Sequence, residues 1–129
     1  MAIRVISLNC NGIRAAARKG MFQWLERQRA DFVCLQETKA QEHQLEDEQF
    51  RPDGYHVFYE DAEKKGYSGV AVYSRHKPKR VVRGFGSAEF DAEGRYLEGA
   101  VAGLSVVSLY LPSGSSREAR QEAKFSFLD

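Results

Sequence analysis

The feature that most constrains the fold is a pair of apolar runs with a helix-like segment between them. Residues 3–8 and 32–36 are rich in aliphatic, β-branched and aromatic residues, which favour buried strands. From about residue 15 to residue 29 the apolar residues change to a helical spacing. A connection of this length lets the two strands run parallel through a right-handed crossover. The chain is therefore predicted to begin with a β-α-β unit of an α/β protein.

Polar side chains follow each of these two strands where it ends. Asn9 and Asn11 flank Cys10 and would point the same way on an extended chain, and Glu37 follows the second run. In open α/β sheets, ligands bind at the carboxyl ends of the strands. One carboxylate with amide oxygens suits Mg²⁺. The pattern predicts a metal or phosphate site, although an Asx turn at the asparagines and an ordinary turn carboxylate explain each residue taken alone.

Beyond residue 54 the apolar period changes to two. Five further strands are predicted, and the glycine-bearing and charged turns between them favour antiparallel pairing; they cover residues 55–59, 69–73, 80–83, 96–101 and 104–111. Residues 42–49 are predicted to form a short surface helix or turn. A helix is expected to begin at Ser115. Nothing near residue 129 closes that helix, so the chain looks cut within an element.

Composition excludes several other classes of protein. The 129 residues suggest one domain, and a net charge of +1 is unlike that of histone-like or tail-like cationic binders. Cys10 and Cys34 lack CxxC spacing, which indicates reduced thiols in a cytoplasmic protein, with an inter-strand disulfide as the minor alternative. Neither an export signal nor an apolar run approaching the roughly 18 residues of a membrane span is found. The absence of GxGxxG and P-loop motifs disfavours a nucleotide cofactor.

Other residues have both a functional and an ordinary interpretation. Lys39 could orient or neutralise Glu37, and a solvated lysine explains it equally well. Tyr67, in a Gly-Tyr-Ser-Gly turn, fits either a hairpin turn or a surface that contacts phosphates. Tyr110 ends a strand, where tyrosine usually packs with its hydroxyl toward solvent. The histidines lack the spacing of metal ligands and are predicted to lie on the surface: His43, His56 and His76.

Several blocks together resemble one family of enzymes. The sequences SLNCNGIRAAARKG, LQETKAQ, GYSGVAVYSR, EGR and SLYLPSGS are similar to those of the exonuclease III class of Mg²⁺-dependent DNA-repair nucleases. That class includes apurinic/apyrimidinic (AP) endonucleases and belongs to the endonuclease/exonuclease/phosphatase superfamily. The blocks occur in the family order and span essentially the whole chain. The resemblance implies the N-terminal half of a four-layer α/β sandwich, in which two packed mixed sheets are flanked by helices.

The resemblance also implies roles for the matching residues. Glu37 is expected to ligate Mg²⁺, for which Mn²⁺ could substitute, and Asn9 to contribute to the same metal environment. Asn11 is expected to act through water or a neighbouring side chain, and Lys39 to orient Glu37. Tyr110 is expected to act in catalysis by hydrogen-bonding the scissile phosphate. Contacts to the DNA backbone are implied for Tyr67, Arg95 and Ser113, and a further hypothesis adds basic residues of the flanking loops: Arg14, Arg18, Lys19, Lys64 and Lys65.

The family pattern continues well beyond residue 129. Its remaining part supplies an Asp-x-Asn pair that activates water and a terminal Asp-His pair at the metal, and this chain contains neither. Residues 1–129 are therefore expected to be the N-terminal part of a single, truncated domain, with one sheet face open to water. By itself this part is expected to be inactive.

For the complete protein, the resemblance implies a monomer that hydrolyses phosphodiesters of duplex DNA at abasic sites or 3′ ends. Two alternatives stay open. One is a superfamily phosphoesterase that acts on a different substrate, such as an inositol phosphate or sphingomyelin. The other is an inert fragment without catalytic function.

Overall fold

The computed structural model describes residues 3–84, 86, 91–101 and 103–111. All seven predicted strands are present, each within two residues of its predicted ends. The elements are β1 (Val5–Asn9), α1 (Ile13–Arg18), α2 (Met21–Gln28), β2 (Phe32–Gln36), β3 (His56–Glu60), β4 (Val70–Ser74), β5 (Arg80–Arg83), β6 (Tyr96–Val101) and β7 (Leu104–Leu109). The segment predicted as a short helix or turn forms two 3₁₀ turns, Glu42–Gln44 and Glu48–Phe50. The helix expected from Ser115 lies outside the described residues.

The first sheet is mixed and has the strand order β1-β2-β4-β3. β1 and β2 are parallel, with Val5 opposite Phe32 and Asn9 opposite Gln36, so the predicted β-α-β unit is confirmed. β4 pairs antiparallel with both β2 and β3. Every residue of β2 and β4 is buried, because these central strands are covered on both faces.

The connection between β1 and β2 differs from its prediction. A single helix over residues 15–29 was expected, whereas α1 and α2 are separate helices. Gly20 lies between them with φ of 95°, a left-handed conformation that glycine adopts without the strain a side chain would bring. The chain therefore turns at Gly20, and Met21 and Leu25 of α2 are buried against the first sheet.

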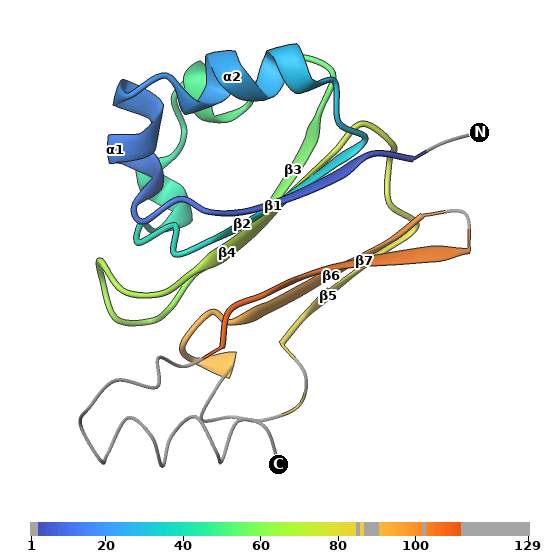
Figure 1. Ribbon diagram of the computed structural model, residues 1–129. Helices are drawn as coiled ribbons and strands as arrows, with labels where there is room; N and C mark the ends of the chain where they lie inside the picture. The colour runs from blue at the N-terminus through green and yellow to red at the C-terminus, as the bar shows by residue number, and fades with distance from the viewer. Residues whose placement is uncertain (1–2, 85, 87–90, 102, 112–129) are drawn as a thin grey trace.

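The second sheet is antiparallel, in the order β5-β6-β7, and packs face to face against the first. Figure 1 shows α1 and α2 on one face of the first sheet and the second sheet on the other. One apolar core lies between the helices and the first sheet, and it includes Leu35 and Tyr73. Another lies between the sheets, where Cys34 and Val72 meet Leu97 and Val106. The described residues thus form a helix layer and two sheet layers.

The outer face of the second sheet carries exposed apolar side chains. Val106 and Ser108 of β7 are buried toward the first sheet, whereas Val107 and Leu109 point the other way and are exposed. The expectation that one sheet face lies open to water stays a prediction, because residues 112–129 are not described. No helix in the described part of the chain has the length and apolar character needed to cross a bilayer.

The loop between β2 and the 3₁₀ turns packs very closely against the turn before β4. Gly69 has φ of 87°, and a Cβ atom built on it would lie 2.2 Å from the Thr38 hydroxyl oxygen. Thr38 is fully buried and lies between Glu37 and Lys39. Only glycine at position 69 therefore leaves this loop in place.

Substituting Gly69 tests this packing, with Gly66 as a matched control. Gly66 has φ of 69°, and a Cβ atom there would meet nothing within 4 Å. Gly66→Ala should lower the free energy of unfolding by about 1–2 kcal/mol, the cost of a left-handed alanine. Gly69→Ala should cost about 1–3 kcal/mol more, because it also overpacks the loop. Urea unfolding measures both variants, and equal losses would show that the contact with Thr38 is unimportant.

Candidate active site

The candidate site lies at the C-terminal ends of β1 and β2, where backbone pairing continues beyond the strands. The Gly12 amide donates a hydrogen bond to the Glu37 carbonyl at 2.7 Å, and the Thr38 amide donates to the Gly69 carbonyl at 3.1 Å. Three loops that are distant in sequence are thereby joined edge to edge. This pairing fixes the backbone from which Glu37 projects.

The same loops hold several residues in the left-handed conformation. In the described part of the chain, four of the five non-glycine residues with positive φ lie here: Asn11 (46°), Glu37 (55°), Lys39 (51°) and Ser68 (50°). Each such residue costs about 1–2 kcal/mol, which persists only where the surroundings impose the geometry. At Glu37 this conformation ends the strand, and the side chain emerges at the end of the sheet.

The Glu37 carboxylate is held from two sides. The Tyr110 hydroxyl donates to Oε1 at 2.5 Å, and the Lys39 ammonium lies 3.5 Å from Oε2. The hydrogen bond from Tyr110 lowers the pKa of Glu37, and the amide of Asn9 and the charge of Lys39 lower it further against the opposing effect of burial. Glu37 is therefore an ionised, partly exposed carboxylate.

Asn9 and Asn11 are both at the site, but not on an extended chain. Asn9 is the last residue of β1, and Asn11 is left-handed. The predicted extended geometry is therefore wrong, and the Asn11 amide instead donates to Asn9 Oδ1 at 3.0 Å, as in an Asx turn. Lys39 Nζ donates to Asn11 Oδ1 at 2.6 Å. Lys39 thus bridges Asn11 and Glu37.

Tyr110 reaches the site from the second sheet. Its amide donates to the Arg95 carbonyl at 2.9 Å, which continues the β6–β7 pairing by one residue. Burial, followed by the hydrogen bond to Glu37, raises the pKa of Tyr110 to about 12. The phenol therefore stays protonated and acts as a hydrogen-bond donor. Its hydroxyl faces Glu37 rather than the solvent that a strand-end tyrosine usually meets.

Arg95, for which a DNA contact was expected, is buried, with only 3% of its surface exposed. Its guanidinium pairs with the Glu93 carboxylate at 3.1 Å and donates to the Tyr67 hydroxyl at 2.8 Å. It also donates to the Tyr110 carbonyl at 3.3 Å and lies 5.0 Å from the centre of the Tyr110 ring. In this structure the contacts of Arg95 are to protein groups, and they link both tyrosines.

The remaining candidates are more exposed. Tyr67 is 38% exposed, and Lys64 lies 5.3 Å from the centre of its ring. Arg14 lines a hollow of about 470 Å³ beside the site, together with Gly12, Ala15, Arg18, Lys39 and Gly66. Lys19 lines a separate hollow with Asn9 and Asn11. Lys65 and the histidines His43, His56 and His76 are exposed. Ser113 lies outside the described residues.

Two supporting residues were missed by the sequence reasoning. Glu93, the ion-pair partner of Arg95, was visible only as the acid of the EGR block. Gln36 is buried, and its amide donates to the Ser108 hydroxyl at 3.1 Å, which in turn donates to the Leu35 carbonyl at 2.8 Å. These bonds tie the two sheets together directly beneath Glu37. A glutamine in an otherwise apolar strand was the available signal.

The oxygen atoms that the described residues bring to the site are of the types that bind a hard cation, but they are too few to complete its coordination. Glu37 offers a carboxylate, and Asn9 and Asn11 offer amide oxygens, which are the ligand types Mg²⁺ takes. Within residues 3–84, 86, 91–101 and 103–111, no group of three or more His, Cys, Asp or Glu side chains could hold a metal ion. A metal at Glu37 would therefore need ligands beyond these residues, such as water or substrate phosphate.

Comparisons with known proteins agree with this fold. The chain is 42% identical over 112 residues to an exodeoxyribonuclease of Bacillus subtilis, covering 86% of this chain and 43% of that protein. It is 35% identical over 115 residues to the DNA repair nuclease APEX1 of Danio rerio, covering 88% and 37%. An AP endonuclease structure from Archaeoglobus fulgidus superposes with a TM-score of 0.85 at 29% identity, covering 98% of this chain and 48% of that one.

These matches establish the fold class and its extent. The chain spans about half the length, or less, of the relatives it matches, which agrees with the N-terminal half of a two-sheet α/β sandwich. Residues 6–128 match the Endonuclease/Exonuclease/phosphatase family. The chain belongs to that family.

Proposed function

We propose that residues 1–129 form the N-terminal part of a single nuclease domain, and that the complete protein hydrolyses DNA phosphodiesters. The observation that carries this proposal is the ionised Glu37 carboxylate, held by the Tyr110 hydroxyl and beside Lys39. Relatives named as exodeoxyribonucleases and AP endonucleases support DNA as the substrate, at abasic sites or 3′ ends. The phosphodiester would bind at the sheet edge where charged and hydrogen-bonding groups are already held in position.

Glu37 and Asn9 would hold Mg²⁺, or Mn²⁺ in its place, with Asn11 and Lys39 orienting them. When bound, the ion supplies Lewis-acid polarisation of the phosphate. Tyr110, protonated across the physiological range, would transfer its one hydrogen bond from Glu37 to the phosphate oxygen on which charge grows, since Glu37 would then face the ion. Lys39 would keep the Glu37 carboxylate ionised and oriented toward the ion.

For Arg95 we propose a positioning role in place of a direct DNA contact. The ion pair with the partly exposed Glu93 fixes the buried Arg95 guanidinium, which then holds Tyr67 and Tyr110 at one edge of the site. Direct contacts to the DNA backbone are proposed instead for exposed residues, namely Arg14 and Tyr67. Ser113 remains a prediction from sequence.

Two alternatives are specific enough to test. The described residues lack a multi-carboxylate metal cluster, which favours inactivity of the 129-residue chain alone. A non-nucleic-acid phosphoester is the other candidate substrate.

The two cysteines support the proposed cytoplasmic location. Both are free thiols, and burial raises the pKa of each to about 11. Cysteines stay as thiols in a reducing compartment such as the cytoplasm.

Glu37→Gln in the full-length protein should reduce Mg²⁺-dependent cleavage of an abasic duplex at least ~100-fold, because the site loses the charged carboxylate that Tyr110 and Lys39 hold. Glu42→Gln removes an exposed carboxylate from the following 3₁₀ turn and should leave cleavage unchanged. The 129-residue chain assayed in parallel should be inactive. Cleavage of an inositol phosphate in preference to the duplex would overturn the proposed substrate.

Tyr110→Phe should lower kcat by about 10²–10³-fold, the usual cost of losing one donor to a charged transition state, with a smaller change in KM. In the metal-free protein the pKa of the Glu37 carboxyl should rise, because its largest stabilising hydrogen bond is gone. Carboxyl-carbon NMR measures this pKa directly. Tyr55→Phe, at the other end of the sheet, should change neither quantity. An unchanged pKa of Glu37 would contradict the contact.

Arg95→Lys and Arg14→Gln should separate positioning from DNA binding. Arg95→Lys keeps the charge but loses the planar group that contacts both tyrosines, so kcat should fall while KM changes little. Arg14→Gln should raise KM and leave kcat intact. The slope of log K against log[salt] should become shallower by about 1, the value for one phosphate contact. If Arg95→Lys behaves like Arg14→Gln, Arg95 contacts DNA itself.

A further inference from the structure

The end of the first sheet opposite Glu37 carries a second group of basic side chains. The connection from β4 to β5 is formed by residues 75–79, which read Arg-His-Lys-Pro-Lys. Arg27 and Arg29, at the end of α2, approach it. A hollow of about 580 Å³ lies between these segments, lined by Arg27, Arg29, Arg75 and Glu26. Three guanidinium groups and one carboxylate give this lining a formal charge of +2.

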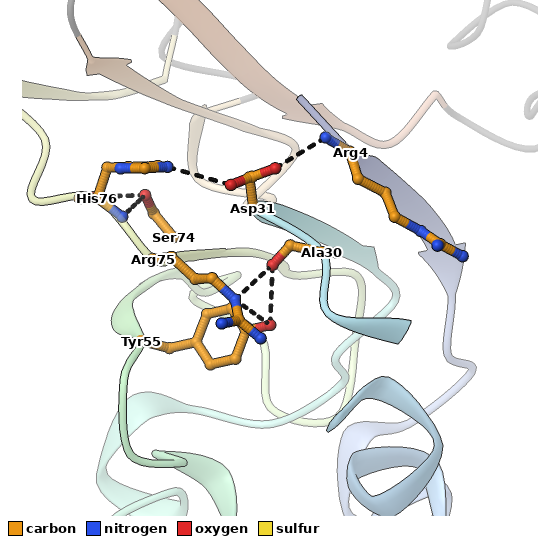
Figure 2. Close-up of polar contacts among 7 residues, drawn as sticks. All are labelled: Arg4, Ala30, Asp31, Tyr55, Ser74, Arg75 and His76. Carbon is orange, nitrogen blue, oxygen red and sulfur yellow. Dashed lines mark hydrogen bonds and ion pairs between the residues drawn. The ribbon is translucent and has the colours of Figure 1, made fainter. Parts of the chain in front are cut away.

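Arg75 is held in a fixed orientation (Figure 2). Its Nε donates to the Ala30 carbonyl at 2.9 Å and to the Tyr55 hydroxyl at 3.3 Å, and its guanidinium lies 5.1 Å from the centre of the Tyr55 ring. Both hydrogen bonds use Nε alone, so the four N–H groups of the terminal nitrogens have no partner in the part of the chain described here. A guanidinium fixed in this way presents its fork to a ligand at little entropic cost.

The side chains of the other two arginines of the hollow lack hydrogen-bond and ion-pair partners among the described residues. Neither Arg27 nor Arg29 makes a side-chain hydrogen bond or ion pair with any described residue, whereas Arg51, Arg80 and Arg83 each lie within 4.0 Å of a glutamate carboxylate. The C-terminus of a helix favours cations, which accounts for Arg27. It does not account for Arg75, which comes from the end of β4 and lines the same hollow.

The carboxylate of Asp31, whose charge acts on Arg75, makes its close contacts with other groups. Asp31 Oδ2 accepts a hydrogen bond from the Arg4 amide at 2.9 Å, and Oδ1 lies 3.2 Å from His76 Nε2 (Figure 2). The backbone donor at Arg4, followed by His76, lowers the pKa of Asp31. Asp31 therefore stays charged, and its two carboxylate oxygens contact Arg4 and His76. Its charge acts on Arg75 without a hydrogen bond between the two side chains, and Glu26 alone among the lining residues opposes the three arginines.

We propose that this hollow, with the flanking Lys77 and Lys79, binds phosphate groups of a nucleic-acid backbone at a surface separate from the Glu37 site. Planar guanidinium groups match the oxygens of a phosphate in a bidentate manner. The five residues of β2 separate the two surfaces by roughly 15–20 Å at about 3.3 Å per residue. The surface would therefore hold a stretch of nucleic acid other than the one at Glu37, and the proposal does not depend on cleavage.

The test measures binding of the full-length protein to a fluorescein-labelled oligonucleotide in EDTA, so that no cleavage occurs. The main variant is the double substitution Arg27→Gln with Arg29→Gln, because the fold would lose no hydrogen bond or ion pair of these side chains with a described residue. The slope of log K against log[KCl], between about 50 and 200 mM, should become shallower by about 1.5–2. Arg75→Gln should act in the same direction by about half as much.

The control is Arg51→Gln/Arg80→Gln, which removes the same charge from residues paired with Glu42 and Glu98. Its slope should stay near that of the wild type, and an equal change would overturn the proposal as a general charge effect. Inorganic phosphate should shift the NMR signal of the Arg75 Nε–H group. If phosphate shifts the Arg75 signal but the variants and the wild type have the same salt slope with the oligonucleotide, nucleic-acid binding is wrong and the ligand is a free phosphate compound. If neither responds, or if poly-glutamate competes as well as the oligonucleotide, phosphate recognition is wrong.

Discussion

The hydrogen bond between Tyr110 and Glu37 joins the two sheets at the point where the chemistry is proposed. Glu37 belongs to the first sheet and Tyr110 to the second, and they lie 73 residues apart in the chain. Their contact at 2.5 Å requires that the sheets pack in one register, because a small sliding of either sheet would separate the groups. The buried Gln36–Ser108 bond beneath them fixes that register from within the core.

The residues that support this contact are themselves held by ion pairs and hydrogen bonds. Arg95 carries a full charge with 3% of its surface exposed, which is tolerable only because Glu93 neutralises it and two tyrosines and a carbonyl satisfy it. On the other sheet, the left-handed residues at Glu37 and Lys39 are held by hydrogen bonds from neighbouring loops. The site therefore concentrates backbone strain and desolvated charge in one place, and both are compensated locally.

The two ends of the first sheet differ in their electrostatics. At the Glu37 end, the lysine nearest the carboxylate is paired with it and with Asn11. At the other end, Asp31 is paired while three arginines face a common hollow. A net charge of +1 for the chain conceals this distribution, because charge summed over a sequence says nothing of where the charges lie.

The β-α-β start, the seven strands and the positions of Glu37, Asn9 and Lys39 at strand ends could be read from the sequence, because alternation and apolar runs are local properties of the chain. The division of the helix at Gly20 and the turn at Asn11 depended on left-handed backbone states, which the apolar pattern does not record. Only the packing of the two sheets decided that Arg95 is buried, that Tyr110 faces Glu37, and that Arg75 joins Arg27 and Arg29. These contacts link residues far apart in sequence, and their geometry is set by how the layers pack.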